Sequence, residues 1–230
     1  MTTAPLRLAV LCSHRAPGMR FLLEEDPARG SIYELVCCVS SEEESAAREE
    51  ADEAGLPFLS HPIARFAATN GTKRSDLAAR ASYDRETLEI LEPYRPDALL
   101  LSSYLLIVTE PLLRAFPDGI VNVHHSDMNR SPRYPGLRAV RDAIFAGETE
   151  TRATAHLVTE VLDEGPILSV SEPFPVSPLV RDALDWGATD ILKAYAYAHQ
   201  EWMIRSAWGP LSSRAVQLVA ERRHHPAVVS

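Results

Sequence analysis

The segment LRLAVLC, residues 6–12, is a short apolar run near the start of a chain of 230 residues. Three similar runs follow, at residues 33–40 (YELVCCVS), 98–101 (ALLL) and 120–123 (IVNV). Short apolar runs of this kind, without regular polar alternation, are typical of strands that are buried on both faces. The four runs therefore predict the central strands of a covered sheet.

Helical patterns lie between these runs. Residues 40–56 (SSEEESAAREEADEAGL) begin with candidate N-caps at Ser40 and Ser41, and Gly55 is a candidate C-cap. Residues 74–94 carry apolar positions near helical spacing, and Pro93 limits that helix. Strands that alternate with helices predict an α/β fold, a Rossmann-like three-layer sandwich with a mostly parallel sheet and helices on both faces.

The pattern changes after about residue 150. Residues 151–158 (TRATAHLV) alternate in polarity and residues 166–176 (PILSVSEPFPV) follow, which predicts an antiparallel pair at the sheet edge. Residues 179–208 predict one long helix that Gly209-Pro210 stops, and a last helix follows to about residue 222. The apolar stripe of this helical region predicts core packing or a homodimer. Residues 61–74 (HPIARFAATNGTKR) are the longest irregular stretch, and we expect a surface loop there.

Composition narrows the choice of partners and compartment. The formal net charge is -9, from 23 basic and 32 acidic residues, which disfavours nonspecific binding to nucleic acid or anionic membranes. Cys12, Cys37 and Cys38 lie in apolar runs and suggest no disulfide framework, so we expect them in the core. The first apolar run is too short for a signal peptide or a membrane span. We expect a soluble cytoplasmic protein without nucleic-acid or membrane partners.

Ligands of open α/β sheets bind beyond the carboxyl ends of the parallel strands, which directs attention to the loops there. The loop at residues 13–18 (SHRAPG) has Gly18 as its single glycine and also contains Pro17, so it does not predict a phosphate cradle. His14 and Arg15 could contact a substrate anion, or they could belong to a solvated loop.

The stretch GIVNVHHS, residues 119–126, delivers polar side chains to the end of a predicted strand. Asn122 and His124 are two residues apart, so both point to the same face, and His125 points to the other. An amide and an imidazole side by side can donate to one carbonyl oxygen that gains negative charge. A structural role for a histidine near a strand end is the alternative.

Asp163 lies beside Gly165-Pro166 in a predicted turn. Such an aspartate can cap the backbone of its turn. It can also face His124, where a carboxylate would favour the imidazolium and orient the ring. His124, His125, His156 and Asp163 are all zinc-type ligands, but no HExxH or paired CxxC motif is present, and neither is the GxSxG elbow of serine hydrolases.

Three of these segments together resemble the formyltransferase family that uses 10-formyltetrahydrofolate. Residues 82–101 (SYDRETLEILEPYRPDALLL) resemble the helix and strand before the folate loop, and NVHHS at 122–126 resembles an Asn-x-His-x-Ser signature. Residues 134–168 resemble the segment that ends in an Asp-x-Gly-Pro motif. The resemblance covers about residues 5–175, and the separation of Asn122 from Asp163 is close to that of the family.

This resemblance implies direct formyl transfer from 10-formyltetrahydrofolate, as co-substrate, to the amine of a small molecule, without a metal. It implies Asn122, His124 and Asp163 as catalytic residues. The folate would lie against Leu105, Leu106, Ile107, Val108, Val158, Glu160 and Leu162. We expect the acceptor near His14, Arg15, Ser126 and Tyr134. A catalytic domain would then span residues 1–178, with a helical C-terminal extension, residues 179–230, packed on it.

Two departures from the family bear on the acceptor. Residues 13–18 stand where the glycinamide ribonucleotide enzyme carries a Gly-Asn-Gly-Ser-Asn phosphate loop, and residues 127–132 form a longer, more polar route to Tyr134-Pro135-Gly136. Leu106 also stands where an arginine is common. An amino sugar, an amino acid or a biosynthetic intermediate remain candidate acceptors. There are three alternatives. The acceptor could be glycinamide ribonucleotide, or the group transferred could be another one-carbon or acyl group such as carbamoyl. The chain could also be a homologue that binds folate without catalysis.

Overall fold

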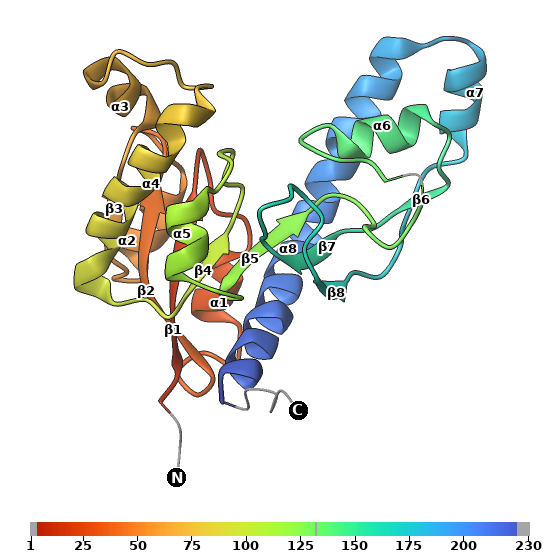
Figure 1. Ribbon diagram of the computed structural model, residues 1–230. Coiled ribbons are helices and arrows are strands. Elements are labelled where there is room, and N and C mark those ends of the chain that lie inside the picture. Colours follow the sequence, from red (N-terminus) through yellow and green to blue (C-terminus); the bar gives the residue numbers. More distant parts are fainter. Residues whose placement is uncertain (1–3, 132, 225–230) are drawn as a thin grey trace, which may run out of the picture.

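A computed structural model describes residues 4–131 and 133–224 of the chain (Figure 1). Its centre is a seven-stranded sheet in the order β3-β2-β1-β4-β5-β7-β8. Residues 1–3, 132 and 225–230 lie outside the described residues. They include the two ends of the predicted domains, 1–178 and 179–230, and one residue of the loop at 127–132.

The sheet is parallel except at one edge. The parallel strands are β1 (Leu6–Cys12), β2 (Tyr33–Ser40), β3 (Phe58–Ser60), β4 (Ala98–Leu101) and β5 (Ile120–His124). The antiparallel strands are β7 (Thr154–Leu157) and β8 (Ile167–Val170), and β6 (Glu150–Thr151) pairs separately with β9 (Phe174–Pro175). The four predicted strands and the antiparallel edge are confirmed, whereas the three-residue β3 was not predicted.

Helices cover both faces of the sheet, as predicted for a three-layer fold. They are α1 (Met19–Glu24), α2 (Ala47–Glu53), α3 (Ile63–Thr69), α4 (Leu77–Leu91), the short 3-10 helix η1 (Glu92–Tyr94), α5 (Glu110–Ala115), α6 (Ala139–Phe145), α7 (Leu179–Asp185) and α8 (Thr189–His224). Side chains of α4 and α5 share a core with one face of the sheet. Side chains of α1, α2, α6, α7 and α8 share a larger core with the other face.

Strand β1 shows why the apolar runs are continuous. Leu8, Val10 and Cys12 pack in the core that α8 covers, whereas Ala9 and Leu11 pack in the core that α4 and α5 cover. Successive side chains of a strand point to opposite faces, so a strand with two buried faces has no position for a solvated residue. All three cysteines are buried and free, which confirms their predicted place in the core.

The predicted helix over residues 179–208 begins at Leu179 as predicted, but the prediction is wrong about its continuity and about its end. The chain breaks between α7 and α8, and α8 then continues through Pro210. The Gly209-Pro210 pair lies where α8 crosses α1, and a Cβ atom on Gly209 would lie 2.6 Å from the Cβ of Phe21. Burial of the flanking Trp208 and Leu211 offsets the backbone hydrogen bond that a proline removes, about 3 kcal/mol.

Two other local predictions are wrong for related reasons. Residues 63–69 form α3 instead of a loop, because Ile63 and Phe66 pack against Tyr83 of α4. The helix predicted from Ser40 begins at Ala47, because Ser40 and Ser41 are buried. The hydroxyl of Ser40 donates to the carbonyl of residue 13 at 2.9 Å instead of capping a helix.

Helix α8 is the longest helix and runs across the side of the sheet that carries β5, β7 and β8 (Figure 1). It contacts these three strands and also α1, α6 and α7. Within the described residues, no helix is both long and apolar enough to cross a membrane.

Candidate active site

The candidate site lies at the carboxyl end of β5, beside the antiparallel edge of the sheet. Asn122 and His124 both project from this strand, and β5 pairs with β7 so that Asn122 lies opposite His156. His124 is 7% exposed, which places a titratable ring almost out of contact with bulk water. The strand therefore presents an amide and an imidazole on one face, as the spacing predicts.

Asp163 reaches His124 from a turn that follows β7. Its Oδ2 atom lies 3.9 Å from Nε2 of His124, close enough for an ion pair when the ring is protonated, and only 13% of its side chain is exposed. Asp163 has a φ of 54°, a left-handed conformation that aspartate adopts more readily than most residues. The turn is shaped by Gly165, where a Cβ atom would lie 1.7 Å from the carbonyl oxygen of Leu157.

The ring of His124 is held by the backbone of a second segment. Its Nε2 atom lies 3.2 Å from the carbonyl oxygen of Tyr134, and because a carbonyl can only accept, Nε2 carries the proton. The backbone N–H of Gly136 makes a long bond of 3.4 Å to Oδ2 of Asp163. Residues 134–136 thus contact both His124 and Asp163.

His156 holds the amide of Asn122, a role that sequence analysis missed. Nδ1 of His156 donates to the carbonyl of Leu157 at 2.8 Å, so its Nε2 is an acceptor and takes a hydrogen from Nδ2 of Asn122 at 3.1 Å. Burial lowers the pKa of His156 and so favours this neutral form. The second N–H of the Asn122 amide is left for another partner. The only sequence signal was the alternation of residues 151–158, which places a histidine on a strand.

All three residues line one cavity of about 220 Å³, here called the first cavity. Its other walls are the loop after β4 and the turn after β7, and they include each predicted folate-contacting residue: Leu105, Leu106, Ile107, Val108, Val158, Glu160 and Leu162. Leu105, Ile107, Val161 and Leu162 are between 42% and 61% exposed, which is unusual for apolar side chains of this size. A flat apolar ligand between the loop and the turn would cover them.

The loop after β4 is anchored at both ends. Ser13 accepts the N–H of Leu105 at 3.0 Å, and Oδ2 of Asp84 accepts the N–H and the hydroxyl of Thr109 at 2.7 and 2.6 Å. Asp84 is fully buried on α4, and burial raises its pKa while the two bonds from Thr109 lower it. In the described part of the chain, the backbone groups of residues 106–108 form no hydrogen bond. A loop that is anchored at both ends and has unfilled backbone donors and acceptors between them suits a heterocycle.

The four residues predicted near an acceptor do not gather at one place. His14 is exposed, and Arg15 forms a bidentate pair with Glu201 of α8 at 2.8 and 2.6 Å. Ser126 and Tyr134 line a different, more polar cavity. The ring of His125 packs against Trp208 on the side of α8, with ring centres 4.5 Å apart and planes tilted by 45°, and burial, aided by the charge of His124, lowers its pKa to about 3.

The zinc alternative concerned His124, His125, His156 and Asp163. His125 lies against Trp208 of α8, and the two ring nitrogens of His156 are hydrogen-bonded to Leu157 and Asn122. Within residues 4–131 and 133–224, no group of three or more His, Cys, Asp or Glu side chains is arranged to bind a metal ion.

The sequence identifies the family to which this fold and this cavity belong. The sequence matches the family model described as formyl transferase over residues 6–182. The chain therefore belongs to the formyl transferase family, in agreement with the resemblance of its motifs.

The similar proteins include one named for purine biosynthesis and one named for the deformylation of formyltetrahydrofolate. Trifunctional purine biosynthetic protein adenosine-3 of Drosophila melanogaster is 31% identical over 176 residues, 75% of this chain and 12% of that protein. Formyltetrahydrofolate deformylase of Bacillus subtilis is 30% identical over 162 residues, 70% of this chain and 48% of that protein. The match thus spans half or less of these curated relatives.

Among solved structures, glycinamide ribonucleotide transformylase 1 from Symbiobacterium toebii is similar in fold. It has a TM-score of 0.66 and 27% sequence identity, and the match covers 95% of this chain and 89% of that chain. The shared fold therefore extends over nearly the whole described chain, including α8.

Proposed function

We propose that the protein is an N-formyltransferase that moves the formyl group of 10-formyltetrahydrofolate to the amine of a small-molecule acceptor. One observation carries this proposal: Asn122, His124 and Asp163 meet in a single cavity between two apolar loops. Family membership supports the reaction class, and the geometry of the site supports the assignment of roles.

The first cavity is the proposed folate site. The pterin ring is flat, with hydrogen-bonding groups along one edge. The apolar side chains of Leu105, Ile107 and Leu162 would cover its faces, and the backbone groups of residues 106–108 would bind its polar edge. Such pockets combine apolar walls with a few well-placed polar groups. This arrangement would place N10 and its formyl group near the carboxyl end of β5.

In the proposed reaction the neutral amine attacks the formyl carbon. A C–N bond forms while the carbonyl π electrons move to oxygen, which becomes an oxyanion. The amide of Asn122 has one N–H left to donate, and a protonated His124 has two ring N–H groups, of which the Tyr134 carbonyl takes one. A preorganised donor of this kind lowers the barrier by about 2.7–4 kcal/mol.

Collapse of the intermediate breaks the bond between the formyl carbon and N10. The attacking amine must lose a proton and the leaving nitrogen must gain one, and Asp163 is placed to pass it through water. The same carboxylate, 3.9 Å from His124, stabilises the charged ring that faces the oxyanion. The products are the N-formyl compound and tetrahydrofolate, and the residues return to their starting state.

Hydrolysis of the same donor is the second candidate, because a formyltetrahydrofolate deformylase is among the relatives at 30% identity. Water would then take the place of the amine at the same carbon. Glycinamide ribonucleotide as acceptor is less favoured, because the loop at residues 13–18 has one glycine and Arg15 is paired with Glu201.

The test is tetrahydrofolate release from 10-formyltetrahydrofolate, measured with and without a metabolite extract as the source of amines. Release that requires the extract, with products heavier by one formyl group in mass spectra, supports transfer. Equal release without it assigns the protein as a hydrolase. Binding of the donor without release in either case assigns it as a folate-binding homologue, and both of these outcomes refute the transferase.

A further inference from the structure

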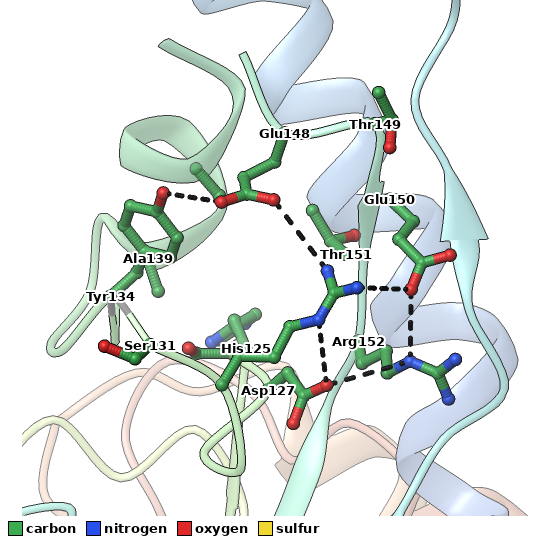
Figure 2. Close-up of a pocket in the computed structure, with 13 residues that line it drawn as sticks. His125, Asp127, Ser131, Tyr134, Ala139, Glu148, Thr149, Glu150, Thr151 and Arg152 are labelled. Carbon is green, nitrogen blue, oxygen red and sulfur yellow. Dashed lines mark hydrogen bonds and ion pairs between the residues drawn. The ribbon is translucent and has the colours of Figure 1, made fainter. Parts of the chain in front are cut away.

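A second cavity of about 310 Å³ lies beyond the carboxyl end of β5, on the side of α6 and β6 (Figure 2). Its walls come from the loop after β5, from α6 and from the strand segment around β6. The side chains used below are His125, Asp127, Arg130, Tyr134, Glu148, Glu150 and Arg152. Most of the lining is polar, in contrast to the apolar walls of the first cavity.

Charged groups from both walls face one another in this second cavity. Arg130 lies 3.2 Å from Glu150, 3.8 Å from Glu148 and 3.9 Å from Asp127. Arg152 lies 3.6 Å from Glu150 and 3.7 Å from Asp127. Figure 2 shows the side chains of Asp127, Glu150 and Arg152 close together. The cluster holds one more carboxylate than guanidinium group, so it favours neutral or cationic ligands over phosphate esters.

The hydrogen-bonding capacity of these carboxylates is largely unused. Glu148 accepts the hydroxyl of Tyr134 at 3.0 Å, and Asp127 accepts the backbone N–H of Asn129 at 3.0 Å. All but one of the pairs with arginine are longer than a good hydrogen bond, and each carboxylate has about four acceptor sites. Side chains of Glu148 and Glu150 are 30% exposed, so a ligand can reach them. Closely spaced acceptors and guanidinium donors match the hydroxyl groups of a polyol.

The second cavity adjoins the reacting centre through shared residues. The backbone carbonyl of Tyr134 binds Nε2 of His124, while its side chain lines the second cavity. His125 lines both cavities, and its Nε2 is buried with no hydrogen-bond partner among the described residues. A buried polar atom without a partner is rare, and this one belongs to a residue that both cavities share. The donor and the acceptor would thus approach the end of β5 from opposite sides.

We propose that the second cavity binds the acceptor, and that the acceptor is an amino sugar or a similar polyhydroxylated amine without a phosphate group. This rests on the proposed function and adds the class of acceptor. A volume near 310 Å³, equal to that of about ten water molecules, has room for one hexose ring. The carboxylates and arginines bind the ring hydroxyls, and the amine extends past His125 towards the formyl carbon.

The first experiment compares acceptors for the intact protein with 10-formyltetrahydrofolate. Glucosamine, glucosamine 6-phosphate and glycine are supplied separately, and tetrahydrofolate release is measured. We expect kcat/KM for glucosamine to exceed that for each of the other two at least tenfold. An equal or better result with the phosphate ester or with glycine overturns the proposal.

The second experiment tests the cavity itself. Glu150→Gln removes one charge with little change of shape, and Glu89→Gln, at an exposed position of α4, is the matched control. We expect Glu150→Gln to raise KM for glucosamine at least tenfold while KM for the donor changes less than twofold, and the control to match wild type. An unchanged KM for glucosamine in a folded Glu150→Gln variant overturns the assignment of the cavity.

A binding measurement separates this proposal from the proposed reaction. Glucosamine binding is followed by saturation-transfer NMR in the presence of tetrahydrofolate, so no transfer is needed. Binding to wild type that Glu150→Gln weakens at least tenfold supports the acceptor cavity, even when no formyl transfer occurs. No binding to wild type, or equal binding to both proteins, refutes it.

Discussion

Substitution of Asn122 by alanine removes the donor whose orientation the structure explains most fully. The amide donates one hydrogen to Nε2 of His156, and His156 is fixed in turn by its bond to the carbonyl of Leu157. The amide therefore does not need to reorient when charge develops on the formyl oxygen. We expect Asn122→Ala to lower kcat and to leave KM for the donor within about twofold, because the bond strengthens in the transition state.

The magnitude follows from the two bonds of this amide. Loss of one preorganised donor raises the barrier by about 2.7–4 kcal/mol, which lowers kcat about 10²–10³-fold. Nε2 of His156 loses its partner, and an unsatisfied buried acceptor costs about 1–3 kcal/mol of folding free energy. His156→Phe keeps the amide but releases its orientation, so we expect a smaller loss of kcat, about tenfold.

The assay is single-turnover formyl transfer with saturating donor, so that product release does not mask the chemical step. Circular dichroism and urea unfolding establish that each variant is folded. Asn70→Ala, at the exposed end of α3, is the control for loss of an asparagine side chain and should retain wild-type kcat. A folded Asn122→Ala variant with kcat reduced less than tenfold, or with KM raised and kcat unchanged, would refute stabilisation of the oxyanion by this amide.

Three further predictions concern the same region. Asp163→Asn should lower kcat at least hundredfold with little loss of stability, because it removes a negative charge 3.9 Å from His124 without changing the size of the side chain. Turnover above a tenth of the wild-type value contradicts this prediction. Because burial lowers the pKa of His125 to about 3, from about 6.5 in the unfolded chain, the unfolded state binds more protons between these values. The free energy of unfolding should therefore fall by about 1.4 kcal/mol per unit as pH drops from 6.5 towards 3, and urea unfolding of His125→Phe should lack this contribution. Gly165→Ala should abolish turnover and destabilise the fold by more than about 3 kcal/mol, because its Cβ would lie 1.7 Å from the carbonyl oxygen of Leu157. In the control Gly71→Ala no atom lies within 4 Å of the new Cβ, so the left-handed backbone alone should cost about 1–2 kcal/mol. Equal losses in thermal unfolding of the two glycine variants would contradict the argument from the close approach at Gly165.

Much of the fold could be predicted from the sequence because it depends on local patterns. The run at residues 6–12 is apolar at nearly every position, and a strand with two buried faces requires this. Local patterns failed where tertiary packing outweighs them. Gly209-Pro210 is a typical helix stop, yet α8 continues through it because the missing Cβ of Gly209 allows contact with Phe21. Residues 63–69 became helical only because Tyr83 covers their apolar side.

The candidate site could be predicted in part for the same reason. Asn122 and His124 are close in the chain, so strand geometry alone places them on one face. The role of His156 depends on the register between β5 and β7, which no local pattern specifies. The two walls of the second cavity are likewise separate in the chain, and only folding brings Asp127 and Glu150 to the same arginine, Arg130.

By itself, the sequence determined four of the parallel strands, the antiparallel edge, the alternation of strand and helix, and the residue types available at the end of β5. The tertiary structure alone decided that Asp163 reaches His124, that His156 holds Asn122, and that a polar cavity adjoins an apolar one. The physical reason is that apolar periodicity and turn chemistry act over a few residues. Contacts between distant segments depend instead on strand pairing and on the packing of a whole core, which are cooperative properties of the folded chain.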